Sequence, residues 1–453
     1  MPDPNRSPDP GRAWAPFEPD AKRPWDLRLA AHLYRRAGFG ASWPQLEEAL
    51  KLGPQRTVDK LLDPGPQAVA FAREHDAYED AAASGDVGGL RAWWLRRMIL
   101  TPQPLLEKMT LFWHGHFGTS AARVPGARLM LDHVQLLRRH ALGNFQTLLE
   151  GVSRDPATLL SLGAAANRKA LPNEDFARQL LDRFALGPGN YTDEDVREVA
   201  RAFTGLFVLR DRLRFFDREH DSGEKTVLGQ KGPFGGEDVV RIVAGQPAAG
   251  ALVVRKLYRW LISETGQPSD ALLAPLAERF AADRDVGRLV ETILRSNLFF
   301  SETAYRRRVK GPVEFAVGIV RGLEGTIPTL PLGNQLASLG QDLYRPPTLK
   351  GWDGGPAWIN RATLVGRSNL AAALLAPAGP YEGKLDPAAV AGQHGRSDAA
   401  PAARFLTDLF LQGDVDDAAV DALSGDLPSS GDFSPALRGF AHGVLTLPEF
   451  QLA

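Results

Sequence analysis

Apolar residues recur at helical spacing along most of the chain. Leu105, Met109 and Phe112 follow one another at steps of four and three residues, and His116 extends the same stripe by four more. Such steps return to one face of an α-helix, so the pattern predicts a helix with one buried side. Pro104, just before the stripe, suits the first turn of that helix.

A second helix is predicted after Asn173, whose side chain can cap the first turn. Phe176, Leu180 and Phe184 then form an apolar line at four-residue steps, and Gly187 ends the pattern. Similar patterns fill most of the remaining chain. The expected fold is therefore mainly α, with multi-helical lobes around a shared core.

The period of the apolar positions changes between residues 212 and 229. Leu213 and Phe215 alternate with polar residues, a polar run follows, and residues 225–228 are again β-prone. Alternation predicts a strand, and two short strands around a polar turn predict a β-hairpin. We therefore expect a small β-hairpin near 212–229, inserted between helical lobes.

Prolines and loop-forming residues divide the chain into four parts. Residues 1–24 are rich in proline, which blocks regular structure, so they are expected to form a flexible arm. Residues 25–375 form the helical domain that contains the hairpin. Residues 376–402, rich in Pro, Gly and Ala, are expected to be a loop or linker, and 403–453 to form helices packed on the main domain.

The charges of the chain are balanced, with 53 Lys and Arg against 54 Asp and Glu. A protein that binds nucleic acid needs a basic surplus, at least locally. We therefore expect no nucleic-acid partner. Apolar residues at 44% and charged residues at 24% are typical of an ordinary globular protein.

The chain contains no cysteine. Disulfides, zinc–thiolate sites and thiol catalysis are therefore excluded, so a metal ion would have to bind to His, Asp or Glu. No apolar run of about eighteen residues occurs, so no transmembrane segment is expected. The first residues lack the apolar segment of a secretory signal, so the sequence as given predicts a soluble protein, cytoplasmic by default.

Two histidines, His114 and His116, stand two residues apart in an aromatic stretch and form a candidate site. On a continuing helix, residues two apart point about 200° away from each other, so one ion could not bind both. Both would face one ion only if the backbone extended at Gly115. The alternative is structural, with two buried and hydrogen-bonded imidazoles packed against Trp113 and Phe117.

His220 and Asp221 form a second candidate site, with Lys225 nearby. An adjacent imidazole and carboxylate can supply two metal ligands, or a base and the carboxylate that orients it. The alternative is a turn in which the Asp221 carboxylate accepts a hydrogen bond from its own backbone before Gly223. Both interpretations stay open.

A polar face of the second predicted helix carries Asp175, Arg178, Gln179 and Asp182. Two carboxylates on one helix face are typical of carboxylate-bridged metal bundles. Gln179 carries no charge and is a poor ligand for a cation. A solvated or salt-bridged face is therefore favoured over a metal site.

A Gly-rich turn near residue 355 carries Trp352 and Trp358, with Asp353 and Asn360 beside them. Two indole rings around such a turn could stack on a sugar ring or a peptide. More often a turn of this kind packs its aromatic side chains into the body of the protein. The packing interpretation is favoured, and the stacking surface is the alternative.

Several of these segments recur as motifs in a fixed order. They are HLYRRAGFG at 32–40, EKMTLFWHGHF at 107–117, PNEDFAR at 172–178, LG at 186–187, YT at 191–192, HDSGEKT at 220–226, KGPVEF at 310–315, GW at 351–352 and AWIN at 357–360. Over about residues 30–375 or more, the chain resembles the bacterial family catalogued as domain of unknown function 1800. The resemblance implies a large, mainly helical protein and brings no activity that can be carried over. It also implies, for some members, a sulfatase- or phosphatase-like partner in a surface or periplasmic pathway.

Two departures from the family pattern bear on activity. Where members commonly carry Tyr-Leu-Asp before an Asn-x-Lys stretch, this chain has Ser161-Leu162-Gly163. Where members carry Arg-Glu-Leu-x-Glu, this chain has RQLLD, with Gln179 and Asp182 at the acidic positions. If those acids are ligands or catalysts in relatives, this chain has lost one of them at Gly163. It has an amide at Gln179 in place of the second, and the shorter Asp182 in place of the third.

Two functional hypotheses follow. The first is a metal-assisted hydrolase, in which one divalent ion acidifies a bound water; it requires an imidazole of the His-Gly-His segment to lie near His220 or Asp221. The second is a non-catalytic helical binding or assembly protein that acts with a pathway partner. The first hypothesis uses His114, His116, His220 and Asp221 as ligands with Asp182 or Glu107 as base, and the binding residues are Trp352, Asp353, Trp358, Asn360, Lys225 and Arg178.

Overall fold

A computed structural model describes residues 9–63, 65–428 and 431–453, and its fold is mainly α-helical, as the hydrophobic pattern predicts. The first helices are α1 (Pro10–Trp14), α2 (Leu27–Ala37), α3 (Trp43–Leu62), α4 (Pro66–Asp76), α5 (Glu79–Ser84), α6 (Val87–Leu100), α7 (Pro104–Phe117) and α8 (Ala127–His140). Within the described ranges, no helix combines the length and the apolar character that a membrane span requires.

The middle of the chain contains both hairpins and a π-helical turn, η1. Its elements are α9 (Phe145–Ser153), α10 (Pro156–Ser161), α11 (Glu174–Gln179), η1 (Leu180–Ala185), α12 (Asp193–Ala202), β1 (Leu206–Leu209), β2 (Arg212–Phe215), η2 (Asp217–Glu219), β3 (Lys225–Val227), β4 (Gln230–Gly232), α13 (Gly236–Ala244), α14 (Pro247–Leu261), α15 (Asp270–Asp283) and α16 (Val286–Arg295). The last elements are α17 (Pro312–Gly322), α18 (Thr329–Ser338), η3 (Gly355–Trp358), α19 (Arg361–Leu375), α20 (Pro387–Gln393), α21 (Ala399–Leu411), α22 (Asp417–Ser424), α23 (Ser434–Thr446) and η4 (Pro448–Gln451).

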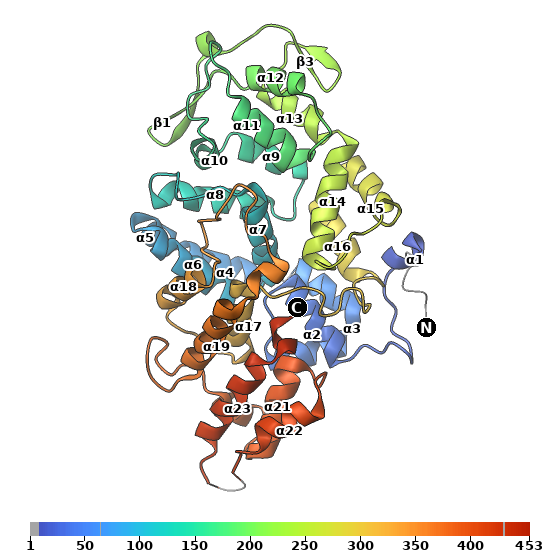
Figure 1. Cartoon of the computed structure of the whole chain (residues 1–453), viewed down its shortest axis with the longest axis vertical. Coiled ribbons are helices and arrows are strands. Elements are labelled where there is room, and N and C mark those ends of the chain that lie inside the picture. Colours follow the sequence, from blue (N-terminus) through green and yellow to red (C-terminus); the bar gives the residue numbers. More distant parts are fainter. Residues whose placement is uncertain (1–8, 64, 429–430) are drawn as a thin grey trace.

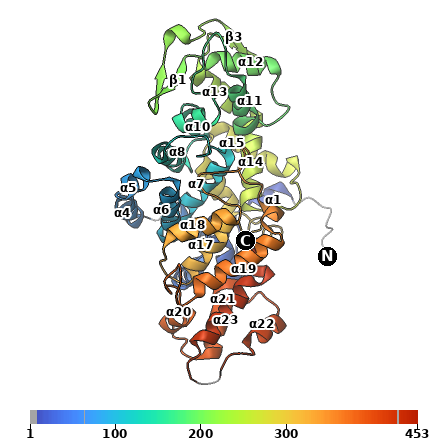
Figure 2. The ribbon, with the colours of Figure 1, turned by 60° about the vertical axis from the view of Figure 1, so that its left-hand side comes forward.

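The elements are stacked along one long axis (Figures 1 and 2). Helices α9 to α13 and both hairpins gather at one end, and α21 to α23 lie at the other. Helices α7 and α14 lie between the two ends. The C terminus returns to the middle of the molecule, where Leu452 pairs with Val309 and the Ala453 amide donates to the Arg308 carbonyl oxygen at 2.8 Å.

The predicted hairpin near 212–229 is in fact two hairpins. Strand β2 pairs with β1 and β3 pairs with β4, whereas β2 and β3 lie in separate sheets. Each hairpin closes through two residues with positive φ, Arg210 and Asp211 in the first and Leu228 and Gly229 in the second. Such tight turns match the twist of paired strands. Each strand therefore pairs with its nearest neighbour rather than across the polar run.

Helices form in two segments that were predicted to lack regular structure. Residues 1–8 of the predicted arm lie outside the described part of the chain, but α1 follows them, and its Trp14 indole donates to the Leu272 carbonyl oxygen at 2.7 Å. The segment 376–402, predicted as a loop or linker, contains α20 and the start of α21. Pro387 lies in the first turn of α20, where a missing N–H costs no helical hydrogen bond. Proline therefore begins such helices instead of preventing them.

Helix α7 is buried almost all round. Its buried side chains include the predicted apolar stripe and also Glu107, Lys108 and both histidines. It packs against α2, α3, α6, α8 and η1. Polar side chains on a helix that is buried on every face must find partners inside the protein. The partners of the α7 side chains therefore organise the surrounding elements.

A loop backbone presses against the C-terminal end of α7. Gly351 has a φ of 78°, and a Cβ atom there would lie 2.2 Å from the Gly115 carbonyl oxygen. Gly118, the left-handed residue that ends α7, is equally confined, because its Cβ would lie 2.5 Å from the Leu349 carbonyl oxygen. Glycine at these two positions lets the two backbones touch, and the contact holds Trp352 beside α7.

We expect Gly351→Ala to destabilise the protein more than Gly163→Ala. Both glycines have positive φ, but a Cβ at Gly163 would meet nothing within 4 Å. Gly163→Ala therefore carries only the backbone strain of an L-residue, about 1–2 kcal/mol. Gly351→Ala adds a clash with α7, which we expect to cost about 1–3 kcal/mol more. Equal free energies of unfolding for the two variants in urea titrations would contradict the close contact.

Candidate functional site

A cleft of about 280 Å³ lies beside the C-terminal half of α7. Its walls come from α7, α14, the segment before α17 and the loop that leads into η3. The volume is close to the lower end of the range for small-molecule sites, about 300–1,000 Å³. A ligand that fills this cleft is therefore small, of the size of a single ring with its substituents.

Three tryptophans line the cleft: Trp260 on α14, Trp352 in the loop, and Trp358 in η3. The indole N–H groups of Trp260 and Trp352 are buried, and neither has a hydrogen-bond partner among the described residues. A buried donor without a partner costs free energy. A ligand that presents an apolar ring face would suit this lining.

A buried ion network forms one wall of the cleft. The Glu314 carboxylate accepts hydrogen bonds from Lys108 Nζ, from Arg308 Nη1 at 3.1 Å and from the Gly311 N–H at 2.7 Å. Arg308 Nε also donates to Glu264 Oε1 at 3.2 Å. Burial alone would raise the pKa of Glu314, but the cations of Arg308 and Lys108 outweigh it and hold that pKa well below its ordinary value. Both carboxylates in this wall are therefore already matched by cations.

His116 and Lys256 form a pair at the other side of the cleft. His116 Nε2 lies 3.0 Å from the Phe184 carbonyl oxygen, and its Nδ1 lies 2.8 Å from Lys256 Nζ. A carbonyl oxygen can only accept, so Nε2 carries the proton and Nδ1 accepts from the ammonium. Lys256 Nζ also donates to the Arg183 carbonyl oxygen at 3.3 Å. The pair thus caps two carbonyls at the end of η1, which a helix end leaves without internal partners.

Burial and neighbouring charge lower the pKa of both groups. Burial lowers the pKa of Lys256 to about 8, and the nearby Arg183 guanidinium acts in the same direction. The pKa of His116 lies well below its ordinary value because of burial and the adjacent Lys256 cation. At neutral pH the imidazole is therefore neutral and most of Lys256 is protonated.

The remaining charged groups of the cleft give it a positive surplus. Arg259 and Lys350 are exposed at the rim, and among the described residues neither forms an ion pair. With Lys256 they make three cations, none of which forms an ion pair with a carboxylate in the described part of the chain. Asp353, also exposed and free of ion pairs with the described residues, is the single opposing charge on that rim. The cleft is therefore suited to an anionic ligand.

His114 points away from the cleft side occupied by His116, as expected for residues two apart on a continuous helix. Its Nε2 accepts a hydrogen bond from the Tyr344 N–H at 3.1 Å, so this nitrogen has no free lone pair. Burial, together with the neighbouring His133, lowers the pKa of His114 to about 3. The side chain is a neutral, buried imidazole, and its aromatic neighbours are Trp94, Tyr344 and Trp352 rather than Trp113 and Phe117.

His220 and Asp221 form a turn at the end of the molecule where the hairpins gather. His220 Nδ1 lies 2.8 Å from the Thr204 carbonyl oxygen. Asp221 accepts hydrogen bonds from Arg201 Nε at 2.7 Å and from the Gly223 N–H at 2.9 Å. The second of these is the backbone contact that the turn interpretation predicts.

The four predicted metal ligands do not come together. Nowhere in residues 9–63, 65–428 and 431–453 do three or more His, Asp or Glu side chains form a group that could hold a metal ion. The histidines of α7 are bonded to Tyr344 and Phe184, whereas His220 and Asp221 are bonded within the α12–β3 region. Figure 1 shows α7 near the middle of the molecule and β3 at one end. The contact that the hydrolase hypothesis requires is therefore not formed.

The two predicted bases are also engaged elsewhere. Asp182 accepts from the Tyr191 hydroxyl at 3.2 Å. Glu107 is buried and accepts hydrogen bonds from Arg97 Nε at 2.8 Å, from Arg138 Nε at 2.8 Å and from the Trp94 indole at 2.8 Å. Neither carboxylate lines the cleft. Asp182 holds the Tyr191 side chain beside η1, and Glu107 joins α7 to α6 and α8.

Of the predicted binding residues, Trp352, Asp353 and Trp358 meet in the cleft. Asn360 instead caps α19, where its side chain accepts from the Thr363 N–H at 3.0 Å. The two remaining residues lie in other parts of the molecule. Lys225 donates to the carbonyl oxygens of Asp221 and Gly223, and exposed Arg178 pairs with Asp193.

Both departures from the family pattern lie outside the cleft. Gly163 is exposed just after α10, and Gln179 is half-buried at the end of α11. Neither residue lines the cleft. The cleft therefore does not depend on the acids that this chain lacks.

Sequence patterns alone did not point to Lys256, Arg259, Arg308 or Glu314. The available signal was the four-residue step from Lys256 to Trp260, which brings a cation and an indole to one face of a helix. No comparable spacing exists for Arg308 and Glu314, because tertiary packing on α7 brings them to the cleft.

The fold and the site together define the class of this protein: it is mainly helical and has a small cationic cleft lined by tryptophans. The chain belongs to the family described as "Protein of unknown function (DUF1800)", whose model matches residues 32–452. This confirms the resemblance inferred from the ordered motifs. No curated protein and no solved structure matches the chain.

We expect Glu107→Gln to cost about 3–5 kcal/mol of folding free energy, because it leaves the buried Arg138 cation without its carboxylate and Arg97 with Asp76 alone. Burial alone would raise the pKa of Glu107, but the Arg138 and Arg97 guanidiniums hold it below its ordinary value. Its stabilising contribution is thus complete above that ordinary value and is lost as the pH falls through the lower, folded-state pKa.

Urea titrations at neutral and acidic pH measure both effects. Glu302→Gln is the matched control, since this glutamate pairs with Arg28 at the surface and should change stability little. A Glu107→Gln variant as stable as Glu302→Gln would contradict the assignment of Glu107 to a buried ion network.

Proposed function

We propose that this chain is a binding protein for a small anionic ligand that contains a ring, of which a sugar acid is the simplest example. The binding site is the cleft between α7, α14 and the loop before η3. The observation that carries the proposal is the set of unpaired cations Lys256, Arg259 and Lys350 around a tryptophan lining. Of the two functional hypotheses drawn from the sequence, the binding protein is the better supported.

The preference for an anion rests on the charges that stay free. The Arg308 cation is matched by Glu264 and Glu314, so it adds little net attraction. Lys256 has a proton left to donate after its bonds to His116 and the Arg183 carbonyl oxygen. A carboxylate that accepts this proton forms a charge-assisted hydrogen bond, which is stronger than a neutral one.

The preference for a sugar-like ring rests on the indoles. Tryptophan faces suit the C–H surface of a sugar ring, and three tryptophans line the cleft. The cleft of about 280 Å³ limits the ligand to about one such ring. The sulfatase- or phosphatase-like pathway partner stays a prediction of the family resemblance.

Isothermal titration with glucuronate and glucose tests the proposal. We expect glucuronate to bind and glucose to bind about ten-fold or more weakly, because a charge-assisted hydrogen bond contributes about 1.5–3 kcal/mol. Lys256→Gln should weaken glucuronate binding by a similar factor. Arg255→Gln is the matched control, since it removes one cation of the same helix that pairs with Asp270 at the surface.

The proposal fails if glucuronate and glucose bind the wild-type protein equally, or if neither binds. It also fails if Arg255→Gln and Lys256→Gln weaken binding to the same extent. Thermal unfolding of both variants shows whether a variant that binds glucuronate more weakly is still folded.

The affinity for glucuronate should fall as the pH rises through about 8, the value to which burial lowers the pKa of Lys256. The sign follows from the charge: the ammonium attracts the carboxylate below this pKa, and the neutral amine above it does not. Titrations between neutral pH and the ordinary lysine pKa of 10.5 measure the change. The Lys256→Gln variant should show no such step, and a wild-type affinity independent of pH in this range would contradict the role of Lys256.

A further inference from the structure

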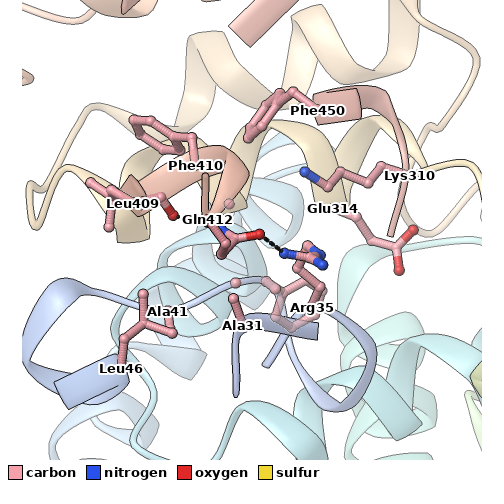
Figure 3. Close-up of a pocket in the computed structure, with 13 residues that line it drawn as sticks. Ala31, Arg35, Ala41, Leu46, Lys310, Glu314, Leu409, Phe410, Gln412 and Phe450 are labelled. Atoms are coloured by element: carbon pink, nitrogen blue, oxygen red, sulfur yellow. Dashed lines mark hydrogen bonds between the residues drawn. The ribbon is translucent and has the colours of Figure 1, made fainter. Parts of the chain in front are cut away.

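A second, smaller cavity lies between the N-terminal and C-terminal helices (Figure 3). It has a volume of about 30 Å³ and is bounded by α2, the segment before α17, the end of α21 and η4. One water molecule needs about 10–15 Å³ by the same measure. The cavity therefore has room for about two waters or one small ion.

Two buried cations face this cavity without a countercharge. Arg35 is 8% exposed, and its Nε and Nη2 atoms have no hydrogen-bond partner among the described residues; its Nη1 donates to the Gln412 side-chain oxygen. Lys310 is 5% exposed. The nitrogen of Lys310 lies 3.5 Å from the ring centroid of Phe450. Figure 3 shows Arg35 and Lys310 on facing walls, with Gln412 beside Arg35.

The nearby carboxylates are already matched by other cations. Glu314 lines the cavity, but its oxygens accept from Lys108, Arg308 and the Gly311 N–H. In Figure 3 its carboxylate points away from the Lys310 ammonium. Asp414, at the end of the molecule that carries α21, pairs with Arg306 at 3.2 Å.

The unpaired guanidinium of Arg35 stays charged at neutral pH, because its pKa lies far above neutrality. Lys310 can become neutral, since burial and the neighbouring Arg35 and Arg306 cations hold its pKa well below the ordinary value. A buried charge is usually paired or neutralised. One small anion beside Arg35 would favour the protonated form of Lys310, and it would accept hydrogen bonds from both side chains.

We propose that the cavity binds one small monovalent anion, either a halide such as chloride or a carboxylate as small as formate, between the Arg35 guanidinium and the Lys310 ammonium. Arg35 belongs to α2, Lys310 precedes α17 and Gln412 ends α21. The bound anion would therefore fasten the C-terminal helices to the N-terminal part of the chain. Its role is structural, and the site is separate from the tryptophan-lined cleft.

Thermal unfolding of the full chain in four sodium salts tests the proposal. Chloride, bromide, formate and isethionate are compared at equal ionic strength and neutral pH; isethionate is monovalent but too large for the cavity, and it is not a sugar acid. We expect Tm to rise saturably by about 1–3 °C in at least one of the three small anions and not in isethionate. A rise in halides alone identifies a halide site, and a rise in formate alone identifies a carboxylate site.

Lys310→Met should remove the saturable rise, whereas Lys384→Met, which removes an exposed lysine, should keep it. Equal Tm values for the wild-type protein in all four salts would overturn the proposal, as would an unchanged rise in Lys310→Met. If Lys310→Met does not fold, crystals of the wild-type protein soaked in bromide give the answer. An anomalous peak between Arg35 and Lys310 supports the site, and its absence, together with Tm values that neither bromide nor formate shifts, overturns it.

Discussion

The buried carboxylate of Glu314 is the interaction on which the rest of the structure depends. It accepts from Lys108 of α7, from Arg308 and from the Gly311 N–H, and so joins α7 to the start of α17. Lys108 Nζ extends the connection to α2, because it also donates to the Gly38 carbonyl oxygen at 2.8 Å. Removing one partner of such a buried pair costs about 3–5 kcal/mol, so these segments hold one another in position.

The same carboxylate separates two different environments. Glu314 lines both the tryptophan-lined cleft and the small cavity beside Arg35. Because its charge is matched by Lys108 and Arg308, it cannot neutralise Lys256 on one side or Lys310 on the other. The positive surplus at both places is therefore a consequence of how the central ion network is arranged. This arrangement is the physical basis for expecting anions at both.

Much of the fold could be predicted from local pattern. The stripe from Leu105 to His116 does form α7, and Asn173 does cap α11, because helical spacing and capping are local properties. Strand pairing was less predictable, since tight turns at residues 210–211 and 228–229 produce two hairpins where one was expected. The segments 1–24 and 376–402 were predicted to lack regular structure because they are rich in proline. Proline is compatible with the first turn of a helix, and α1 and α20 each begin with one.

The candidate site was harder to predict because tertiary contacts assemble it. Trp352 and Trp358 could be identified from their Gly-rich turn, and they do line the cleft. The histidines of α7 were predicted to be metal ligands. In the structure, the Tyr344 N–H donates to one nitrogen of His114, and one nitrogen of His116 donates to the Phe184 carbonyl oxygen. Lys256 comes from a helix about 140 residues away in sequence, and nothing local links it to His116. Such long-range pairs are set by packing, which residue spacing does not encode.

Fluorine NMR of the protein labelled with 5-fluorotryptophan tests the central claim most directly, because each of the nine tryptophans reports on its own surroundings. The account predicts that glucuronate shifts the resonances of Trp260, Trp352 and Trp358, while that of Trp14, buried beside Leu272, stays in place. Unchanged resonances for all three cleft tryptophans at saturating glucuronate would contradict it.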